Sequence, residues 1–387
     1  MVDRRRPRRC VLMTADTVGG VWTYSIELAT HLAGLGVRTY LATMGAPPRA
    51  AQRAQAAAVP GLSLFESSWK LEWMDSPWDD VERAGSWLLD LEERLGPDVV
   101  HLNGYCHGAL PFRAPSVVVG HSCVLSWWEA VKGEPPPATL DRYRDEVARG
   151  IRGASALIAP TRAMLDAIMR HYEVEPSARV IHNGCSFERG LRSPVPKEPL
   201  VFCAARAWDE AKNLETLAQA APGVPWPVFV AGDARHPSNG AMVPLPGVTL
   251  LGSLDPRGVR GWLQRASIFV LPARYEPFGL SALEAAAEGC ALVLGDIPSL
   301  REVWGSSATY VSPDDPQELR EVLSDLAVDD ERRRAMAIRA RRRALEYTAE
   351  PMAERYLDVY EDLVLRRDLR LAAEHYADQA GSNGWSS

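Results

Sequence analysis

The sequence predicts an α/β protein of two doubly wound domains, and three observations support this. Short apolar runs alternate with segments of helical period along most of the chain, as in a parallel sheet whose strands are joined by helices. Several runs are apolar at every position, which is typical of strands covered by helices on both faces. The 387 residues exceed one ordinary domain and fit two.

The predicted strands are about eleven short apolar segments. They are residues 10–14, 37–43, 98–103, 116–120, 156–159 and 179–181 in the first half, and 200–204, 227–231, 248–251, 268–271 and 291–294 in the second. This is more than one open sheet usually holds, so we expect two sheets.

Helical periods fill the segments between the predicted strands. They are clearest at residues 22–33, 78–95, 213–220 and 317–326, and the C-terminal segment 350–371 is also helical by period. A proline-rich stretch without periodicity at 188–199 is the predicted hinge. We therefore expect an N-terminal domain over residues 1–190 and a C-terminal domain over residues 191–346.

Composition excludes several classes of protein. Lys and Arg total 43 against 50 Asp and Glu, a net charge of −7, which gives no support to nucleic-acid binding. The six cysteines are scattered without a C-x-x-C pair, which favours a reduced, cytoplasmic protein over a disulfide scaffold. No segment is long and apolar enough to predict a membrane span, and the apolar run at 11–13 is too short for an export signal.

A glycine-containing turn follows the first predicted strand. Gly19 and Gly20 end the segment 16–20 and open the next helix, where backbone N–H groups can approach an anion or a sugar. A tight turn alone would explain the same pair. The G-x-G-x-x-G fingerprint is absent, which disfavours a dehydrogenase.

Two cations follow the strand that opens the second half. Arg206 lies just after the predicted strand 200–204, and Lys212 lies six residues later, near a helix start. Ligands bind at this edge of a doubly wound sheet, and Arg as a fork with Lys as a point charge suits a diphosphate. Two surface cations in ordinary ion pairs are the alternative.

The densest signal is the segment 271–290. Glu276 lies in a proline-flanked loop after a buried strand, and Gly279, between Phe278 and Leu280, allows close backbone approach before a helix. Glu284 lies one turn into that helix, so both carboxylates can reach one pocket. A helix N-terminus with favourable acids would explain Glu284 alone, but not the whole string.

Glu276 and Glu284, eight positions apart, resemble the E-x7-E motif of retaining GT-B glycosyltransferases of family GT4, also called glycosyltransferase group 1. Further motifs follow the family's order over residues 9–365: the Gly19-Gly20 turn, His121 after an apolar strand, Ala159-Pro160-Thr161, residues 181–184, the Arg206 and Lys212 pair, and residues 231–233. The sequence departs from the family pattern at Ser122, where an Asp often follows the histidine, and at Ala207-Trp208 in the arginine loop.

The resemblance implies a role for each matching residue. Arg206 and Lys212 would bind the diphosphate of a nucleoside diphosphate sugar, and Glu284 its ribose. Glu276 and the backbone of residues 278–280 would hold the transferred sugar and its phosphate.

The resemblance also assigns the facing side of the cleft and the reaction. His121 would meet the sugar near the reacting centre, with Gly19 and Gly20 beside it. The fold would be GT-B, two Rossmann-like domains that face each other across a cleft. The C-terminal helix, about residues 347–387, would cross back onto the first domain, which would bind the acceptor. The activity implied is hexosyl transfer from a UDP- or GDP-type donor to a small-molecule, glycan or lipid-linked acceptor, with retention and with no metal or other cofactor.

Some alternatives stay open. A GT-B sugar-nucleotide epimerase or a non-catalytic nucleotide-sugar-binding protein would share these motifs. The arginine-dense segment 331–345 suits either a solvated helix face or a peripheral membrane contact. Trp127 and Trp128 suit either packing or stacking on a ligand. His101, Cys106, His107 and Cys123 match no zinc spacing.

Overall fold

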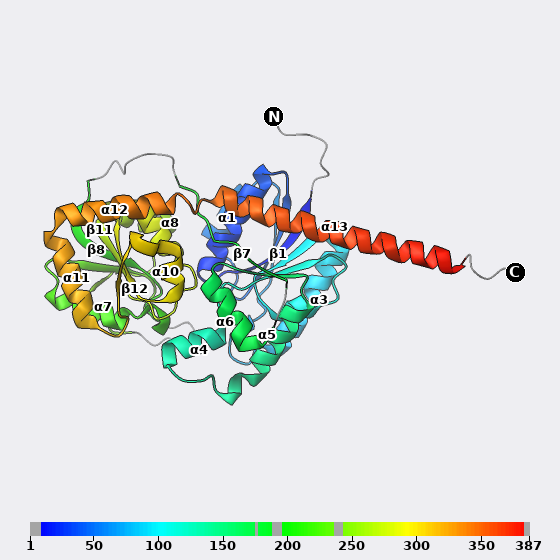
Figure 1. Ribbon diagram of the computed structural model, residues 1–387, viewed down its shortest axis with the longest axis horizontal. Helices are drawn as coiled ribbons and strands as arrows, with labels where there is room; N and C mark the ends of the chain where they lie inside the picture. The colour runs from blue at the N-terminus through cyan, green and yellow to red at the C-terminus, as the bar shows by residue number, and fades with distance from the viewer. Residues whose placement is uncertain (1–8, 175–176, 188–195, 236–242, 383–387) are drawn as a thin grey trace.

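The computed structural model describes residues 9–174, 177–187, 196–235 and 243–382, which form two parallel sheets side by side (Figure 1). The first sheet has the order β3-β2-β1-β4-β5-β6-β7 and the second β10-β9-β8-β11-β12-β13. The strands are β1 (Cys10–Asp16), β2 (Arg38–Met44), β3 (Leu62–Glu66), β4 (Val99–Leu102), β5 (Ser116–Val119), β6 (Ala156–Ala159), β7 (Ala178–Val180), β8 (Glu198–Ala204), β9 (Val228–Ala231), β10 (Thr249–Leu250), β11 (Ala266–Leu271), β12 (Ala291–Gly295) and β13 (Thr309–Val311).

Helices connect the strands in each half. They are α1 (Gly20–Gly34), α2 (Ala50–Ala58), α3 (Trp78–Leu95), α4 (Val124–Lys132), α5 (Asp141–Gly153), α6 (Arg162–Tyr172), α7 (Leu214–Ala220), α8 (Pro256–Arg265), α9 (Leu280–Ala287), α10 (Pro298–Trp304), α11 (Pro316–Val328), α12 (Asp330–Ala344) and α13 (Ala349–Ser382). The predicted class, two doubly wound α/β domains, is confirmed.

Two strands were missed by the sequence analysis. β3 is an edge strand whose residues are all partly or fully exposed, and β13 is a three-residue edge strand of the second sheet. Neither forms a continuous apolar run, because an edge strand needs less burial than a central one. The expected total of about eleven strands was therefore too low.

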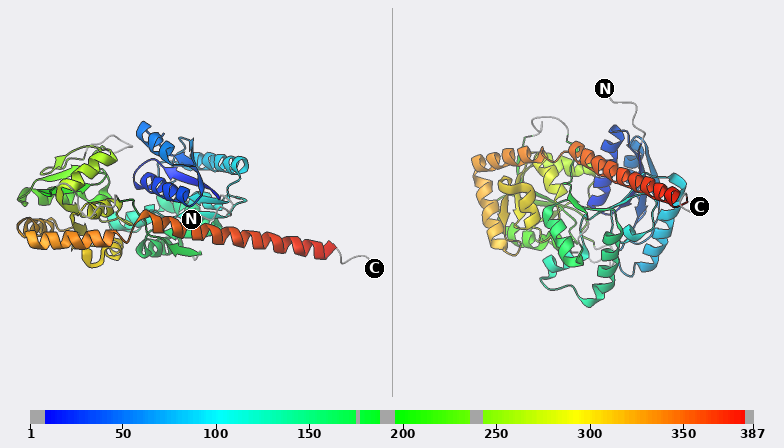
Figure 2. Two further views of the ribbon diagram at one scale, coloured as in Figure 1. Left: turned by 90° about the horizontal axis from the view of Figure 1, so that it is seen from above. Right: turned by 45° about the vertical axis from the view of Figure 1, so that its right-hand side comes forward.

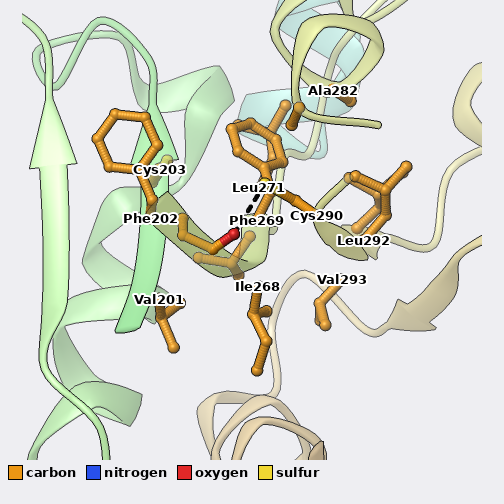
Figure 3. Packing of buried hydrophobic residues seen from close by; sticks show 14 of the residues in the cluster. Val201, Phe202, Cys203, Ile268, Phe269, Leu271, Ala282, Cys290, Leu292 and Val293 are labelled. Carbon is orange, nitrogen blue, oxygen red and sulfur yellow. Dashed lines mark hydrogen bonds between the residues drawn. The ribbon is translucent and has the colours of Figure 1, made fainter. Parts of the chain in front are cut away.

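The central strands of the second sheet form an apolar core. Side chains of β8, β11 and β12 interdigitate there, among them Phe202, Phe269 and Leu292, each fully buried (Figure 3). Ala282 of α9 packs on the same cluster. This packing fixes the carboxyl ends of β8 and β11, from which the loops carrying Arg206 and Glu276 emerge.

The last helix returns to the first sheet. α13 begins at the junction of the two domains and runs across the first, and its far end projects beyond the body of the protein (Figures 1 and 2). Met352, Tyr356 and Tyr360 join the core around β1, with Val11 and Met13. The first domain is therefore completed by residues from the end of the chain.

Most of the predicted hinge, residues 188–195, lies outside the described residues, and the boundaries at 190 and 346 stay predictions. Within the described ranges the two halves also touch directly. The Glu302 carboxylate accepts the backbone N–H groups of Arg162 and Ala163, at 2.7 and 2.9 Å, at the start of α6. No helix in the described part of the chain is long and apolar enough to cross a membrane.

Candidate active site

The loop after β8 carries the first predicted cation. The Arg206 guanidinium donates from Nη2 to Asp209 Oδ2 at 2.7 Å and lies over the Trp208 ring, 5.1 Å from its centre. Its side chain is 40% exposed, so it is held in place and still open to a ligand. Trp208, one of the departures from the family pattern, thus supports the cation from one face.

Lys212 and Glu276 form a nearly buried ion pair. Lys212 Nζ lies 2.8 Å from Glu276 Oε2, and the two side chains are 13% and 15% exposed. The other oxygen, Oε1, accepts the backbone N–H of Gly279 at 3.0 Å. Gly279 has φ of 89° as the N-cap of α9, a conformation that glycine adopts without strain. The structure therefore brings Lys212 and Glu276 together beside the N-terminus of α9.

Asp209 ties the two cations together, and the sequence analysis did not single it out. Burial raises the pKa of its carboxyl, but the charges of Lys212 and Arg206, together with the hydrogen bonds that the carboxylate accepts, hold the pKa below its ordinary value. Its Oδ1 accepts the N–H of Ala211 and, across the domain interface, the indole N–H of Trp127 at 3.3 Å. The sequence pattern that could have identified Asp209 is a carboxylate three residues after an arginine at a strand end.

Glu284 lies one turn into α9, as predicted. Burial, and then the negative charge of Glu27 on α1, raise the pKa of Glu284 to about 7. Its carboxylate has no hydrogen-bond or ion-pair partner within the part of the chain that the structure describes. Phe278 turns away into the core against Tyr347, so only its backbone is left for a ligand.

The glycine turn of the first domain meets the donor loops of the second. Gly19 has φ of 85°, and a Cβ there would lie 3.2 Å from Arg206 Nη1. A Cβ on Gly20 would lie 3.6 Å from Leu280 Cδ1. Beside them, burial raises the pKa of Asp16 to about 7, against the opposing effects of the Val18 N–H and Arg206.

His121 follows β5 at the same edge of the first sheet. Its Nε2 lies 2.8 Å from Asn103 Oδ1, and its ring meets that of Tyr24 edge-on, with centres 4.4 Å apart. Burial, and then His101, lower the pKa of His121 to about 3, so the imidazole is neutral. Asn103 was not predicted as a site residue, although it follows β4 directly at the neighbouring strand end.

Hydrogen bonds between the halves bring the His121 loop beside the Glu276 loop. The Cys123 N–H donates to the Tyr275 hydroxyl at 3.0 Å, and the Thr161 hydroxyl donates to the Pro277 carbonyl at 3.0 Å. The predicted residues of both domains therefore line one region between the two sheets. Within the described ranges, no group of three or more His, Cys, Asp or Glu side chains is placed to hold a metal ion.

Both halves of the chain match known glycosyltransferase families. Residues 18–189 match the family described as Glycosyltransferase Family 4, and residues 198–329 match Glycosyl transferases group 1. A D-inositol 3-phosphate glycosyltransferase of Xylanimonas cellulosilytica is 33% identical over 404 aligned positions, covering 91% of this chain and 94% of the relative. The chain belongs to glycosyltransferase family GT4.

A second relative of the same name, from Corynebacterium kroppenstedtii, is 32% identical and covers 70% of this GT4 chain and 68% of its own. Among solved structures, sucrose-phosphate synthase from Thermosynechococcus elongatus superposes with a TM-score of 0.77 at 17% identity, covering 93% of this chain and 100% of that chain. Anabaena HepE in complex with UDP-glucose superposes with a TM-score of 0.71 at 16% identity, covering 91% and 99%. The fold is GT-B, and the protein is a glycosyltransferase of this type.

Contacts in this GT4 protein bear on two of the alternatives that the sequence left open. Trp127 lies at the domain interface through its bond to Asp209, which favours packing over ligand stacking. In α12, Arg333 lies over the Trp226 ring and Arg343 donates to the Val303 carbonyl, so both hold the helix on its domain. Peripheral membrane contact by the other arginines stays a prediction.

Proposed function

We propose that the protein transfers a hexosyl unit from a UDP- or GDP-type sugar to an acceptor hydroxyl, with retention of the anomeric configuration. The observation that carries the proposal is the pair of cations, Arg206 and Lys212, held by carboxylates at the carboxyl ends of β8 and β11. Fixed cations facing a helix N-terminus suit a diphosphate, whose charge grows as it departs.

The donor would lie along the second domain. Its diphosphate would take the place beside Lys212 and Arg206, and its ribose hydroxyls would donate to the Glu284 carboxylate. Glu276 and the N–H groups at the start of α9 would face the transferred sugar and its phosphate. His121, neutral and across the interface, would meet the sugar from the first domain, beside Gly20.

The chemistry would be a front-face displacement. The bond between the anomeric carbon and the phosphate oxygen breaks while the bond to the acceptor oxygen forms on the same face. The acceptor proton passes to the departing phosphate oxygen, and the cations stabilise the resulting diphosphate. Electrostatic stabilisation of the leaving group would be the largest contribution to the rate. The chain's own cations would supply that charge, so we propose that no metal is required.

The relatives suggest the first substrates to test. The two relatives described above, at 33% and 32% identity, bear the name D-inositol 3-phosphate glycosyltransferase, and HepE is described in complexes with UDP-glucose and with UDP. We therefore propose a UDP-sugar as donor and a phosphorylated polyol as the first acceptor class, with glycan and lipid-linked acceptors next.

The test is turnover with UDP-glucose, UDP-N-acetylglucosamine or GDP-mannose, with and without D-inositol 3-phosphate and with EDTA. We expect release of nucleoside diphosphate that depends on the acceptor and survives EDTA. Conversion of the donor without any acceptor would indicate the epimerase alternative. Donor binding without turnover on any acceptor tried would favour the non-catalytic alternative.

Proton NMR of the first product tests retention. An α-linked donor should give an α-linked product, identified by its anomeric coupling constant. A β-linked product would overturn the proposed stereochemistry while leaving the donor site intact.

A further inference from the structure

A chain of hydrogen bonds runs from the returning helix α13 to His121. Tyr360 of α13 places its hydroxyl 2.6 Å from Nδ1 of His101, a fully buried residue of β4. His101 Nε2 lies 3.0 Å from Asn103 Oδ1, and the same oxygen lies 2.8 Å from His121 Nε2. One amide oxygen therefore faces two imidazole rings.

The orientation of the Asn103 amide sets the direction of these bonds. Its Nδ2 lies 2.7 Å from the backbone carbonyl of Thr14 and 3.2 Å from the Ser25 hydroxyl. A carbonyl only accepts, so the group facing Thr14 must be the NH₂. The opposite atom is then the oxygen, which can only accept from the two histidines. Both rings must carry a proton on Nε2.

Both rings are also neutral at pH 7, which fixes the second nitrogen. Burial lowers the pKa of His101 to about 4 and that of His121 to about 3, and His101 contributes to the second shift. A neutral ring protonated on Nε2 has a bare Nδ1. Tyr360 must therefore donate to Nδ1 of His101.

The Nδ1 atom of His121 is left as an acceptor. Within the described part of the chain, this Nδ1 makes no hydrogen bond. It is also not sealed inside the protein, because the fully buried polar atoms without a partner there do not include it. The edge contact with the Tyr24 ring limits rotation of the imidazole. His121 thus presents a fixed lone pair rather than an N–H.

We propose that Asn103, His101 and Tyr360 are positioning residues that hold His121 in its Nε2–H tautomer, so that Nδ1 accepts a hydrogen bond from a hydroxyl of the bound sugar. The inference deepens the proposed function and rests on it only for the identity of the hydroxyl. It gives α13, the last helix of the chain, a part in the active site of the first domain.

The first measurement is the tautomer of His121 in the ligand-free protein, from long-range proton–nitrogen NMR correlations at pH 7.5, assigned with His121→Gln. We expect one neutral tautomer, protonated on Nε2. Asn103→Ala removes the shared acceptor and should give a mixture of tautomers. A wild-type ring protonated on Nδ1, or an unchanged single tautomer in Asn103→Ala, would overturn the proposal.

Helix α13 supplies a matched pair of variants. Tyr360→Phe removes the donor to His101 and should shift the His101 and His121 nitrogen signals. Tyr356→Phe removes a hydroxyl one turn earlier on the same buried face, which makes no hydrogen bond to His101, Asn103 or His121 within the described residues, and should shift these signals far less. Equal shifts in the two variants would contradict a specific relay. This pair also keeps the test decisive if Asn103→Ala fails to fold.

Kinetics then connect the tautomer to the proposed transfer. With UDP-glucose, Asn103→Ala should lower kcat by about tenfold, roughly what one or two hydrogen bonds contribute, with donor affinity changed less than about twofold. An unchanged kcat with a mixed tautomer would refute the role in turnover. If the wild-type protein shows no transferase activity while the NMR results hold, the proposed function fails and the positioning network stands.

Discussion

The two sides of the site are held together by different interactions. On the donor side, charged groups pair at short range, as in Lys212 with Glu276 and Arg206 with Asp209. On the facing side, neutral groups share hydrogen bonds, with Asn103 between two uncharged imidazoles.

The difference corresponds to what each side is proposed to bind. A leaving diphosphate is an anion, and fixed cations stabilise it in proportion to the charge it develops. Sugar hydroxyls are neutral and directional, and a neutral acceptor of fixed tautomer distinguishes them by geometry. Charge substitutions should therefore be costly on the donor side, whereas the facing side should respond to the loss of single hydrogen bonds.

The largest effect is expected from Lys212→Ala. It leaves the Glu276 carboxylate nearly buried without its cation, which should lower the free energy of unfolding by about 3 kcal/mol. UDP affinity should fall by at least about tenfold, because a charge-assisted contact is lost. Urea denaturation and titration calorimetry measure the two losses separately.

Lys132 supplies the matched control. Lys132 Nζ lies 2.6 Å from Glu210 Oε2, and this pair joins two separate segments of the chain, as Lys212 and Glu276 do. Unlike that pair, its two side chains are 32% and 60% exposed. Lys132→Ala should change the free energy of unfolding by less than about 1 kcal/mol, because solvent screens an exposed pair. Similar losses in both lysine variants would show that burial of the donor-side pair is not what matters.

Sequence reasoning recovered the donor side far better than the facing side. Lys212, Glu276 and Glu284 lie in two short segments whose residue types and spacing predict a phosphate site. By contrast, His101 and Tyr360 are 259 residues apart, and their contact depends on how α13 returns. No local pattern encodes that path, so the network could not be predicted from the sequence.

The same distinction applies to the fold. Central strands such as β6, over Ala156–Ala159, are apolar at every position and were predicted with the correct bounds. The edge strand β3 is half exposed and is recognisable only through its pairing with β2. Local hydrophobicity predicts buried strands, whereas edge strands are defined by the neighbours they acquire on folding.

A second effect, on the pH dependence of stability, should follow from Glu284→Gln. The raised pKa means that the folded state keeps a proton that the unfolded chain loses between about pH 4.5 and 7. Wild-type stability should therefore fall as pH rises through that window and then level. The variant cannot ionise there, so it should become more stable than wild type, by up to about 3 kcal/mol above pH 7 and by almost nothing near pH 4.

Glu27 tests the cause of that shift. Glu27→Gln removes the negative charge facing Glu284 and should move the window to lower pH without abolishing it, because burial is the larger cause. Urea denaturation from pH 4 to 8 follows all three proteins. A Glu284→Gln curve parallel to wild type would mean that Glu284 titrates normally in the folded state.

The smallest effect concerns the bond that joins the two sides. The Trp127 N–H, from the first domain, reaches Asp209 Oδ1 at 3.3 Å, and Asp209 in turn holds Arg206. Trp127→Phe keeps an aromatic ring and loses one hydrogen bond to a charged group, which should weaken UDP binding by about 1 kcal/mol. The neighbouring Trp128 has a buried indole N–H with no hydrogen-bond partner within the described residues, so Trp128→Phe should leave UDP affinity unchanged. Calorimetry that finds the same affinity for both variants would mean that the first domain does not act on the cations, and that the two sides of the site are energetically independent.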